Sequence, residues 1–198
     1  EFRRVLFRSG KIYACTYPKA KLVSYDPKTN EMADLGVMDS TQMYTRSICT
    51  GPDGRIYLAI GYGRANAVVY DPKTGEHKSI LPDIYREDPA QTATSVYTGV
   101  DGNVYINAAK MVAGQDGAKS PQGVVLQVKG DAVEEVASPA SPVSNKTLRD
   151  GRIVQNAKLD GSFGLLKPDG SVEKHTFQYK GAGSGIFMVS NGPLGRIY

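Results

Sequence analysis

Short apolar runs separated by turn residues form the pattern of this 198-residue chain. In the clearest stretch, the runs at residues 44–50, 55–60, 67–70 and 77–81 are rich in β-branched and aromatic side chains, which favour β-strands. The segments between these runs contain Gly, Pro, Asp and Asn, the residues that tight turns prefer. No stretch of ten or more residues carries a convincing helical stripe. The pattern therefore predicts an all-β protein.

This pattern repeats along the chain. A segment of the form Gly-X-(Ile/Val)-(Tyr/Val) recurs at spacings of 44, 48, 49 and 44 residues, beginning at Gly10, Gly54, Gly102, Gly151 and Gly195. A turn motif follows in register, as YDPKTN at residues 25–30 and as YDPKTG at residues 70–75. Roughly 40 to 50 residues with four strands per repeat are typical of a β-propeller blade. We therefore expect a β-propeller fragment of about four blades, each with four antiparallel strands.

The two ends of the chain interrupt the repeat. Propellers close into a ring of about 4–8 blades. A fifth repeat begins at Gly195, so we expect the fragment to be cut from a larger ring. Residues 1–9, EFRRVLFRS, lack an initiator Met, and arginines interrupt their apolar residues. They read as translated adapter or vector sequence. We expect residues 1–9 to be a non-native tail and residues 10–198 to form the partial propeller domain.

Composition narrows the possibilities without naming a function. The formal charge is +4, and the only cysteines are Cys15 and Cys49. Both lie in predicted strands, where a free Cys acts as a small buried apolar residue, so we expect two buried thiols and no disulfide bond. No Cys/His spacing suits zinc, and no apolar run approaches the length of a membrane helix. No basic run is interleaved with aromatics, so we expect neither a metal, nor a membrane, nor a nucleic acid as partner.

The repeat resembles that of a known group of proteins. GPDGRIY at residues 51–57, followed by an apolar run and YDPKTGE at residues 70–76, is similar to bacterial propellers with NHL-like, YVTN-like and sugar-lactonase-like repeats. The resemblance covers about residues 10–198 and implies a fold but no activity. The chain has no Trp, whereas WD40 repeats carry Trp-Asp and quinoprotein repeats end in a docking Trp, so no cofactor is expected. Lactonase-type propellers gather Glu, Asn and Asp around an axial metal, but here the inner strands offer only Asn145 and, at a loop end, Asp39.

Blade topology predicts which loops can share a site. The repeated Asp-Gly and Asp-Pro-Lys-Thr turns should all lie at one end of the blades. The irregular loops should lie at the opposite end near the axis, which we call the top face. The longest top loops are expected at Ala108–Gln122 and Pro82–Gln91. Over all the top loops and the adjoining strand ends taken together, Lys and Arg outnumber Asp and Glu by ten to six, which suits an anionic ligand such as a uronate-containing saccharide.

The sharpest candidate constellation opens a predicted inner strand with Tyr44 and Arg46. Residues two apart in a strand point to the same side, so these two side chains should be neighbours. An Arg there could pair with a carboxylate, and a Tyr beside it could remove a proton, as β-elimination from a uronate requires. His77 and His175 fall in predicted outer strands, away from the axis. The predicted ligand-binding set is therefore Arg46, Tyr44, Tyr62, Arg64 and Lys110.

Three interpretations of function remain open at this stage. The first is a periplasmic or secreted propeller that binds a small or oligomeric, acidic carbohydrate on its top face. The second is a polysaccharide lyase or glycoside hydrolase of the same architecture, with Tyr44 and Arg46 as catalytic candidates and its other catalytic residues in further blades. The third is a scaffold whose top face binds protein. The sequence assigns neither an oligomeric state nor a ligand identity.

Overall fold

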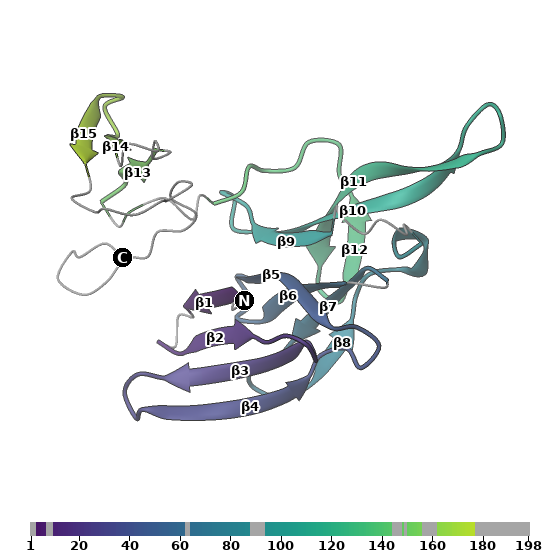
Figure 1. The fold of residues 1–198 in the computed structure, drawn as a ribbon, viewed down its shortest axis with the longest axis horizontal. Helices are drawn as coiled ribbons and strands as arrows, with labels where there is room; N and C mark the ends of the chain where they lie inside the picture. The colour runs from purple at the N-terminus through teal and green to yellow at the C-terminus, as the bar shows by residue number, and fades with distance from the viewer. Residues whose placement is uncertain are drawn as a thin grey trace. The chain divides into compact units, whose positions relative to one another are not determined.

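A computed structural model describes part of the chain, and Figure 1 shows its fold. Side chains are described for residues 10–61, 64–87, 94–143, 148, 150–155 and 162–176, and the backbone alone for Arg3–Leu6. The chain divides into two units, Glu1–Pro142 and Val143–Tyr198. Within the described residues the one helical element is a 3-10 turn, η1 (Asp83–Tyr85), and every other element is a strand. The all-β prediction is confirmed.

The first unit holds three four-stranded antiparallel sheets, and each strand pairs with the one before it in the chain. These sheets are the first three blades. Blade 1 consists of β1 (Arg3–Leu6), β2 (Ile12–Cys15), β3 (Lys21–Asp26) and β4 (Glu31–Val37). Blade 2 consists of β5 (Tyr44–Thr50), β6 (Ile56–Gly61), β7 (Asn66–Tyr70) and β8 (His77–Ser79). Blade 3 consists of β9 (Ser95–Thr98), β10 (Val104–Ala113), β11 (Lys119–Lys129) and β12 (Ala132–Glu135).

The second unit holds a three-stranded antiparallel sheet. Its strands are β13 (Ile153–Val154), β14 (Ser162–Leu166) and β15 (Val172–Thr176). The strand that the repeat predicts before β13 lies outside the described residues, as does the fifth repeat at Gly195. The Gly-X-(Ile/Val) segments open β2, β6, β10 and β13, which are the equivalent strands that the repeat predicts.

The N-terminal segment takes a place in blade 1. The backbone of β1 pairs with β2, with Arg3 opposite Cys15 and Leu6 opposite Ile12, so it fills the position of a first strand. The first strands of the three blades lie next to one another, because β1 contacts β5 and β5 contacts β9. This is the radial order of a propeller. The artificial origin of residues 1–9 stays a prediction, since any extended segment can supply this backbone pairing.

The core lies between neighbouring blades, and β6 shows how. Successive side chains of a strand point to opposite faces. Ile56, Leu58 and Ile60 pack into the cluster shared with blade 1. Tyr57 and Ala59 pack into the cluster shared with blade 3. Every residue of β6 is therefore buried, and the strand reads as a continuous apolar run rather than an alternating one.

The two cysteines are free and occupy these separate clusters. Cys15 is 2% exposed in the cluster between blades 1 and 2, and Cys49 is 7% exposed in the cluster between blades 2 and 3. Burial raises the pKa of both thiols to about 12. They are structural apolar residues, as the sequence predicts.

The repeated Asp-Gly turns close a small polar corner in the same way in two blades. In blade 2, Asp53 accepts hydrogen bonds from the backbone N–H of Arg55 at 3.0 Å and from the hydroxyl of Tyr57 at 2.8 Å. A Cβ atom added to Gly51 would lie 2.7 Å from the Tyr57 ring, so only Gly fits there. In blade 3 the hydroxyl of Tyr105 donates to Asp101 at 2.6 Å. The repeated Asp-Gly motif thus stabilises the turn between the first two strands of a blade.

The expected loop at Ala108–Gln122 is not a loop. The pairing of β10 with β11 continues without a break from Tyr105 opposite Gln127 to Ala113 opposite Lys119. A short turn closes it, where the N–H of Gly114 donates to the carbonyl of Ala118 at 2.7 Å. Figure 1 shows this hairpin extending beyond the rest of blade 3. The prediction of an irregular loop is wrong, because small and polar residues here pair as a regular ribbon with exposed faces.

Candidate functional site

The candidate site lies at the top face, where the inner strand of blade 2 begins. The meander places the β6–β7 loop and the β4–β5 and β8–β9 connections at the end opposite the Asp-Gly turns. Tyr44 is the first residue of β5, and it pairs with Gly61, the last residue of β6. The ring of Tyr44 lies 5.6 Å from that of Tyr17 in the β2–β3 loop of blade 1, with the two planes tilted by 58°.

Arg46 is the extra residue of a β-bulge. Thr45 pairs with Ile60 and Ser47 with Ala59, so no residue of β6 stands opposite Arg46. A bulge breaks the two-residue alternation and re-aims side chains. The alternation argument that would make Tyr44 and Arg46 neighbours on one side therefore does not hold here. The Ser47 hydroxyl accepts from the N–H of Val96 in blade 3.

The guanidinium of Arg46 is incompletely satisfied. Its Nε is buried and has no hydrogen-bond partner among the described residues. A buried donor without a partner costs free energy, more so when it is charged.

Two other predicted cations are already paired. Arg64 donates to Asp83 of η1 at 2.9 Å. Lys110 donates to both carboxylate oxygens of Glu135, at 2.8 and 3.0 Å, and the hydroxyl of Tyr85 donates to the same carboxylate at 2.9 Å. Glu135 lies on β12, the outermost strand of blade 3, so Lys110 forms its ion pair within its own blade. The fifth predicted ligand residue, Tyr62, lies outside the described residues.

A buried polar network supports this end of blade 2. Asn66 is 1% exposed and donates to Asp39 at 2.7 Å and to Ser79 at 2.9 Å. Burial acts to raise the pKa of Asp39, but hydrogen bonds from Thr41 and Asn66 outweigh it and hold the pKa below its usual value. The network fixes the β4–β5 connection, and therefore the start of β5, against β7. It positions the site, and the isolated sequence gave no signal that Asn66 would be buried.

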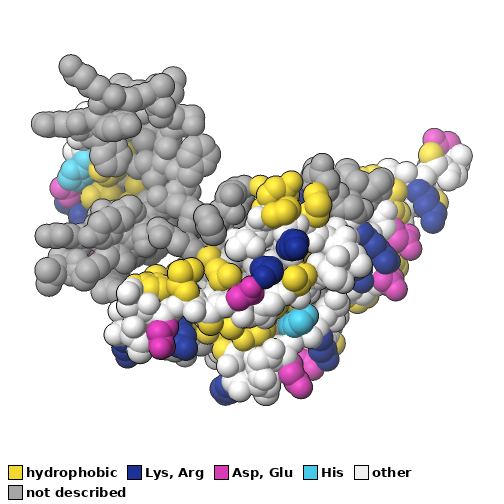
Figure 2. Space-filling view, turned by 60° about the horizontal axis from the view of Figure 1, so that its bottom comes forward, with side chains coloured by type: hydrophobic (Ala, Val, Ile, Leu, Met, Phe, Trp, Pro, Cys, Tyr) yellow, Lys and Arg dark blue, Asp and Glu magenta, His cyan; other side chains and the backbone are white. Residues whose placement is uncertain are grey.

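Charge on the described surface is mixed rather than of one sign. Figure 2 shows Lys and Arg side chains interspersed with Asp and Glu on the face it presents. The basic excess expected on the top loops is offset by acids that come from strands. Lys21 pairs with Asp34 of β4, and Lys110 pairs with Glu135 of β12. Arg46 therefore differs from the other basic candidates because its Nε has no described partner, and not because it lies in a larger positive surface.

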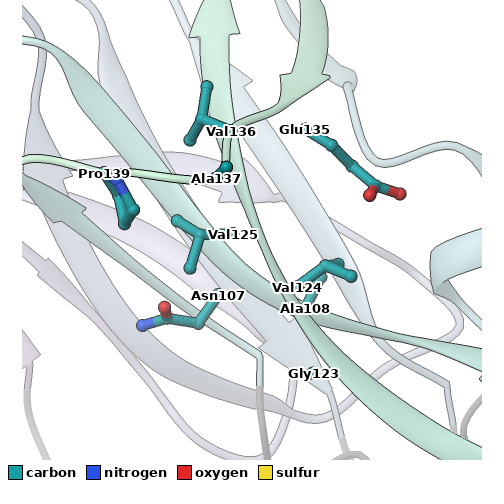
Figure 3. Close-up of a pocket in the computed structure, with 9 residues that line it drawn as sticks. All are labelled: Asn107, Ala108, Gly123, Val124, Val125, Glu135, Val136, Ala137 and Pro139. Atoms are coloured by element: carbon teal, nitrogen blue, oxygen red, sulfur yellow. The ribbon is translucent and has the colours of Figure 1, made fainter.

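A cavity of about 660 Å³ among the described residues lies away from this site (Figure 3). Its walls come from β10, β11 and the segment after β12, and they include Asn107, Val125, Val136 and Pro139. By the repeat, Asn107 of β10 corresponds to Ala59 of β6, which packs against the next blade. By the repeat, the cavity therefore lies on the face of blade 3 that corresponds to the face of β6 on which Ala59 packs.

Other site types find no support among the described residues. No group of three or more His, Cys, Asp or Glu side chains is arranged to hold a metal ion there. His175 stacks on Phe163 within its own sheet. Over the same residues, no helix has the length and hydropathy needed to span a membrane.

Comparison with known proteins supports the fold. No protein-family model and no curated protein matches the sequence. The chain is similar to the tricorn protease, with a TM-score of 0.55 and 15% identity over 90% of this chain and 22% of that one. It is also similar to a fungal alcohol oxidase of the AA5 family in complex with copper, with a TM-score of 0.51 and 16% identity over 88% of this chain and 53% of that one.

A third likeness is to the PQQ-bound aldose sugar dehydrogenase of Streptomyces coelicolor, with a TM-score of 0.45 and 18% identity over 92% of this chain and 64% of that one. The chain thus spans less than two thirds of each of these three proteins. At such low sequence identities, structural similarity supports a shared fold but does not indicate a shared activity. The four-stranded meanders, together with the two likenesses whose TM-scores exceed 0.5, define the chain as β-propeller in fold.

Proposed function

We propose that this propeller binds an acidic carbohydrate at its top face, with Arg46 as the residue that holds a carboxylate. The carrying observation is the buried Nε of Arg46, which has no partner among the described residues, on a bulge of an inner strand. The planar guanidinium matches a carboxylate in geometry and remains charged when partly buried. A uronate supplies that carboxylate on a sugar ring.

The pairing of the other cations supports the choice of Arg46 over its rivals. Arg64 and Lys110 each have a carboxylate partner, so a ligand would have to displace Asp83 or Glu135 to reach them. Arg46 requires no such displacement. A ligand oxygen that accepted a hydrogen bond from Nε would remove the free-energy cost of this unpaired buried donor, and this would favour affinity.

Titration calorimetry with a uronate-containing oligosaccharide tests this proposal. Arg46→Ala should weaken binding about 10- to 100-fold, the scale of a hydrogen bond to a charged group. Arg46→Lys should recover only part of the affinity, because an ammonium lacks the planar fork. Arg64→Ala is the matched control and should change affinity less than about threefold. Unchanged affinity in Arg46→Ala would remove Arg46 from the site, and a wild type that binds no acidic glycan would remove the function.

A further inference from the structure

Tyr17, in the β2–β3 loop, stands out among the exposed side chains. Tyr17 is 55% exposed, although a tyrosine ring is largely apolar. Its loop is held in place, because the N–H of Thr16 donates to the carbonyl of Lys21 at 3.0 Å and Lys21 pairs with Asp34. The ring is therefore an exposed apolar surface on an ordered loop, and the sequence pattern did not single it out.

The contact of Tyr17 with Tyr44 joins two blades. Tyr17 belongs to blade 1 and Tyr44 to blade 2, and their ring centroids are 5.6 Å apart. The ring planes are tilted by 58°, so the two rings touch without stacking face to face. The pair is thus a supported platform at the top of the interface between blades 1 and 2.

The platform and the proposed carboxylate site share the start of β5. Tyr44 is the first residue of this strand and Arg46, the bulged residue, is the third, so both lie at its top end although strand alternation does not set their directions. Aromatic rings that are apolar across the face and polar at the hydroxyl suit ligands that are amphipathic in the same way. A pyranose ring is such a ligand, since it presents C–H groups on its face and hydroxyl groups at its rim.

We propose that Tyr17 and Tyr44 form a stacking subsite for a neutral sugar next to the carboxylate site at Arg46. The inference rests on the proposed function and names its substrate class, an oligosaccharide in which a uronate is linked to a neutral pyranose. Tyr17 supplies the open ring face, and Tyr44 holds that ring in position. A lone uronate would contact Arg46 without using the platform.

Calorimetry with two probes separates the subsite from the carboxylate site. The probes are glucuronate alone and a trisaccharide of one glucuronate and two neutral hexoses. Tyr17→Ala should weaken the trisaccharide about tenfold and leave glucuronate unchanged within about twofold, because only the longer ligand reaches the platform. Tyr17→Phe should keep the trisaccharide affinity within about twofold, since the ring remains. Arg46→Ala should weaken both probes.

Matched controls keep each outcome decisive. Ile84→Ala removes an equally exposed apolar side chain, also 55% exposed, and should affect neither probe. Thermal unfolding should show that Tyr17→Ala is folded at the temperature of the titration, with a midpoint lowered only slightly by loss of the contact with Tyr44. Full trisaccharide affinity in Tyr17→Ala would overturn the subsite while leaving Arg46 in place. Equal losses for both probes would overturn it too, because Tyr17 would then act through the carboxylate site. A wild type that binds neither probe would reject the proposed function itself.

Discussion

The two ends of blades 2 and 3 are built by different rules. At the Asp-Gly end, both blades use the same corner, in which a tyrosine hydroxyl donates to the turn aspartate. At the top face the same blades diverge. Blade 2 joins β6 to β7 by a short loop, whereas blade 3 extends β10 and β11 into a long hairpin. The Asp-Gly end repeats the same packing in both blades. The top end of blade 2 carries the bulge and the incompletely paired guanidinium of Arg46, and its Tyr44 contacts the exposed ring of Tyr17 from blade 1.

This contrast teaches where sequence repetition is informative. A corner recurs in the sequence because every blade must turn its inner strand back under the same geometry. The top face has no such requirement, so its residues differ between blades and can serve a ligand. Substitutions at the two ends should therefore differ in kind. Those at the Asp-Gly end should alter stability, and those at the top face should alter binding.

The largest effect on stability is expected from Gly51→Ala at the corner of blade 2. A Cβ there would lie 2.5 Å from an oxygen of Asp53 and 2.7 Å from the Tyr57 ring, so the corner must shift. We expect the free energy of unfolding to fall by about 2 kcal/mol, the usual scale of overpacking. Gly123→Ala on the hairpin is the control, because nothing lies within 4 Å of its added Cβ. Denaturant unfolding that shows equal effects for both variants would break the contrast between the ends.

A smaller effect is expected from Tyr57→Phe, which removes the hydroxyl that donates to Asp53. We expect a loss of about 1 kcal/mol at neutral pH, the usual contribution of a hydrogen bond. Tyr85→Phe at the top face loses a similar bond to exposed Glu135 and should cost less than about 0.5 kcal/mol, because Lys110 still pairs with that carboxylate. Chemical denaturation of both variants, measured beside the wild type, tests the ordering.

Acid sharpens the same comparison. Burial acts to raise the pKa of Asp53, but hydrogen bonds from Arg55 and Tyr57 outweigh it and place the pKa below its ordinary value of 3.8. A carboxylate with a lowered pKa contributes stability above the unfolded pKa, and that contribution is lost as the pH falls through the folded value. The stability difference between Tyr57→Phe and the wild type should therefore persist from neutral pH to about pH 4. The difference in unfolding free energy should decrease only below about pH 4. A difference that disappears already between pH 7 and pH 5 would show that a group other than Asp53 causes it.

A small effect is also expected from shortening the hairpin of blade 3. Residues 111–121 can be replaced by Asn-Gly, which joins the register partners Lys110 and Gln122 through a two-residue turn. The removed part is mostly exposed, so the unfolding free energy should change by less than about 1 kcal/mol. Retained Lys110 keeps its pair with Glu135. A large loss of stability by thermal unfolding would show that the hairpin belongs to the core and not to the variable end.

The sequence alone determined the architecture of this protein. The period of the Gly-X-(Ile/Val) segments located the equivalent strands, and β5 begins and ends where its apolar run predicted, at Tyr44 and Thr50. This worked because blades repeat the same local chemistry, so turn residues and strand lengths are encoded within a few positions. The burial of both cysteines followed from the same reasoning.

Only the tertiary structure decided which of the candidate residues are paired and which are exposed. A bulge at Arg46 depends on the register between β5 and β6, and the pairing of Lys110 with Glu135 depends on a strand 25 residues away. The contact of Tyr17 with Tyr44 depends on how two blades pack. None of these relations is visible in local periodicity, because each is a distance between segments that are far apart in the chain. The repeat therefore specified the scaffold and the sequence pattern proposed Arg46, whereas only the folded chain showed that the Nε of Arg46 has no described partner and that Tyr17 contacts Tyr44.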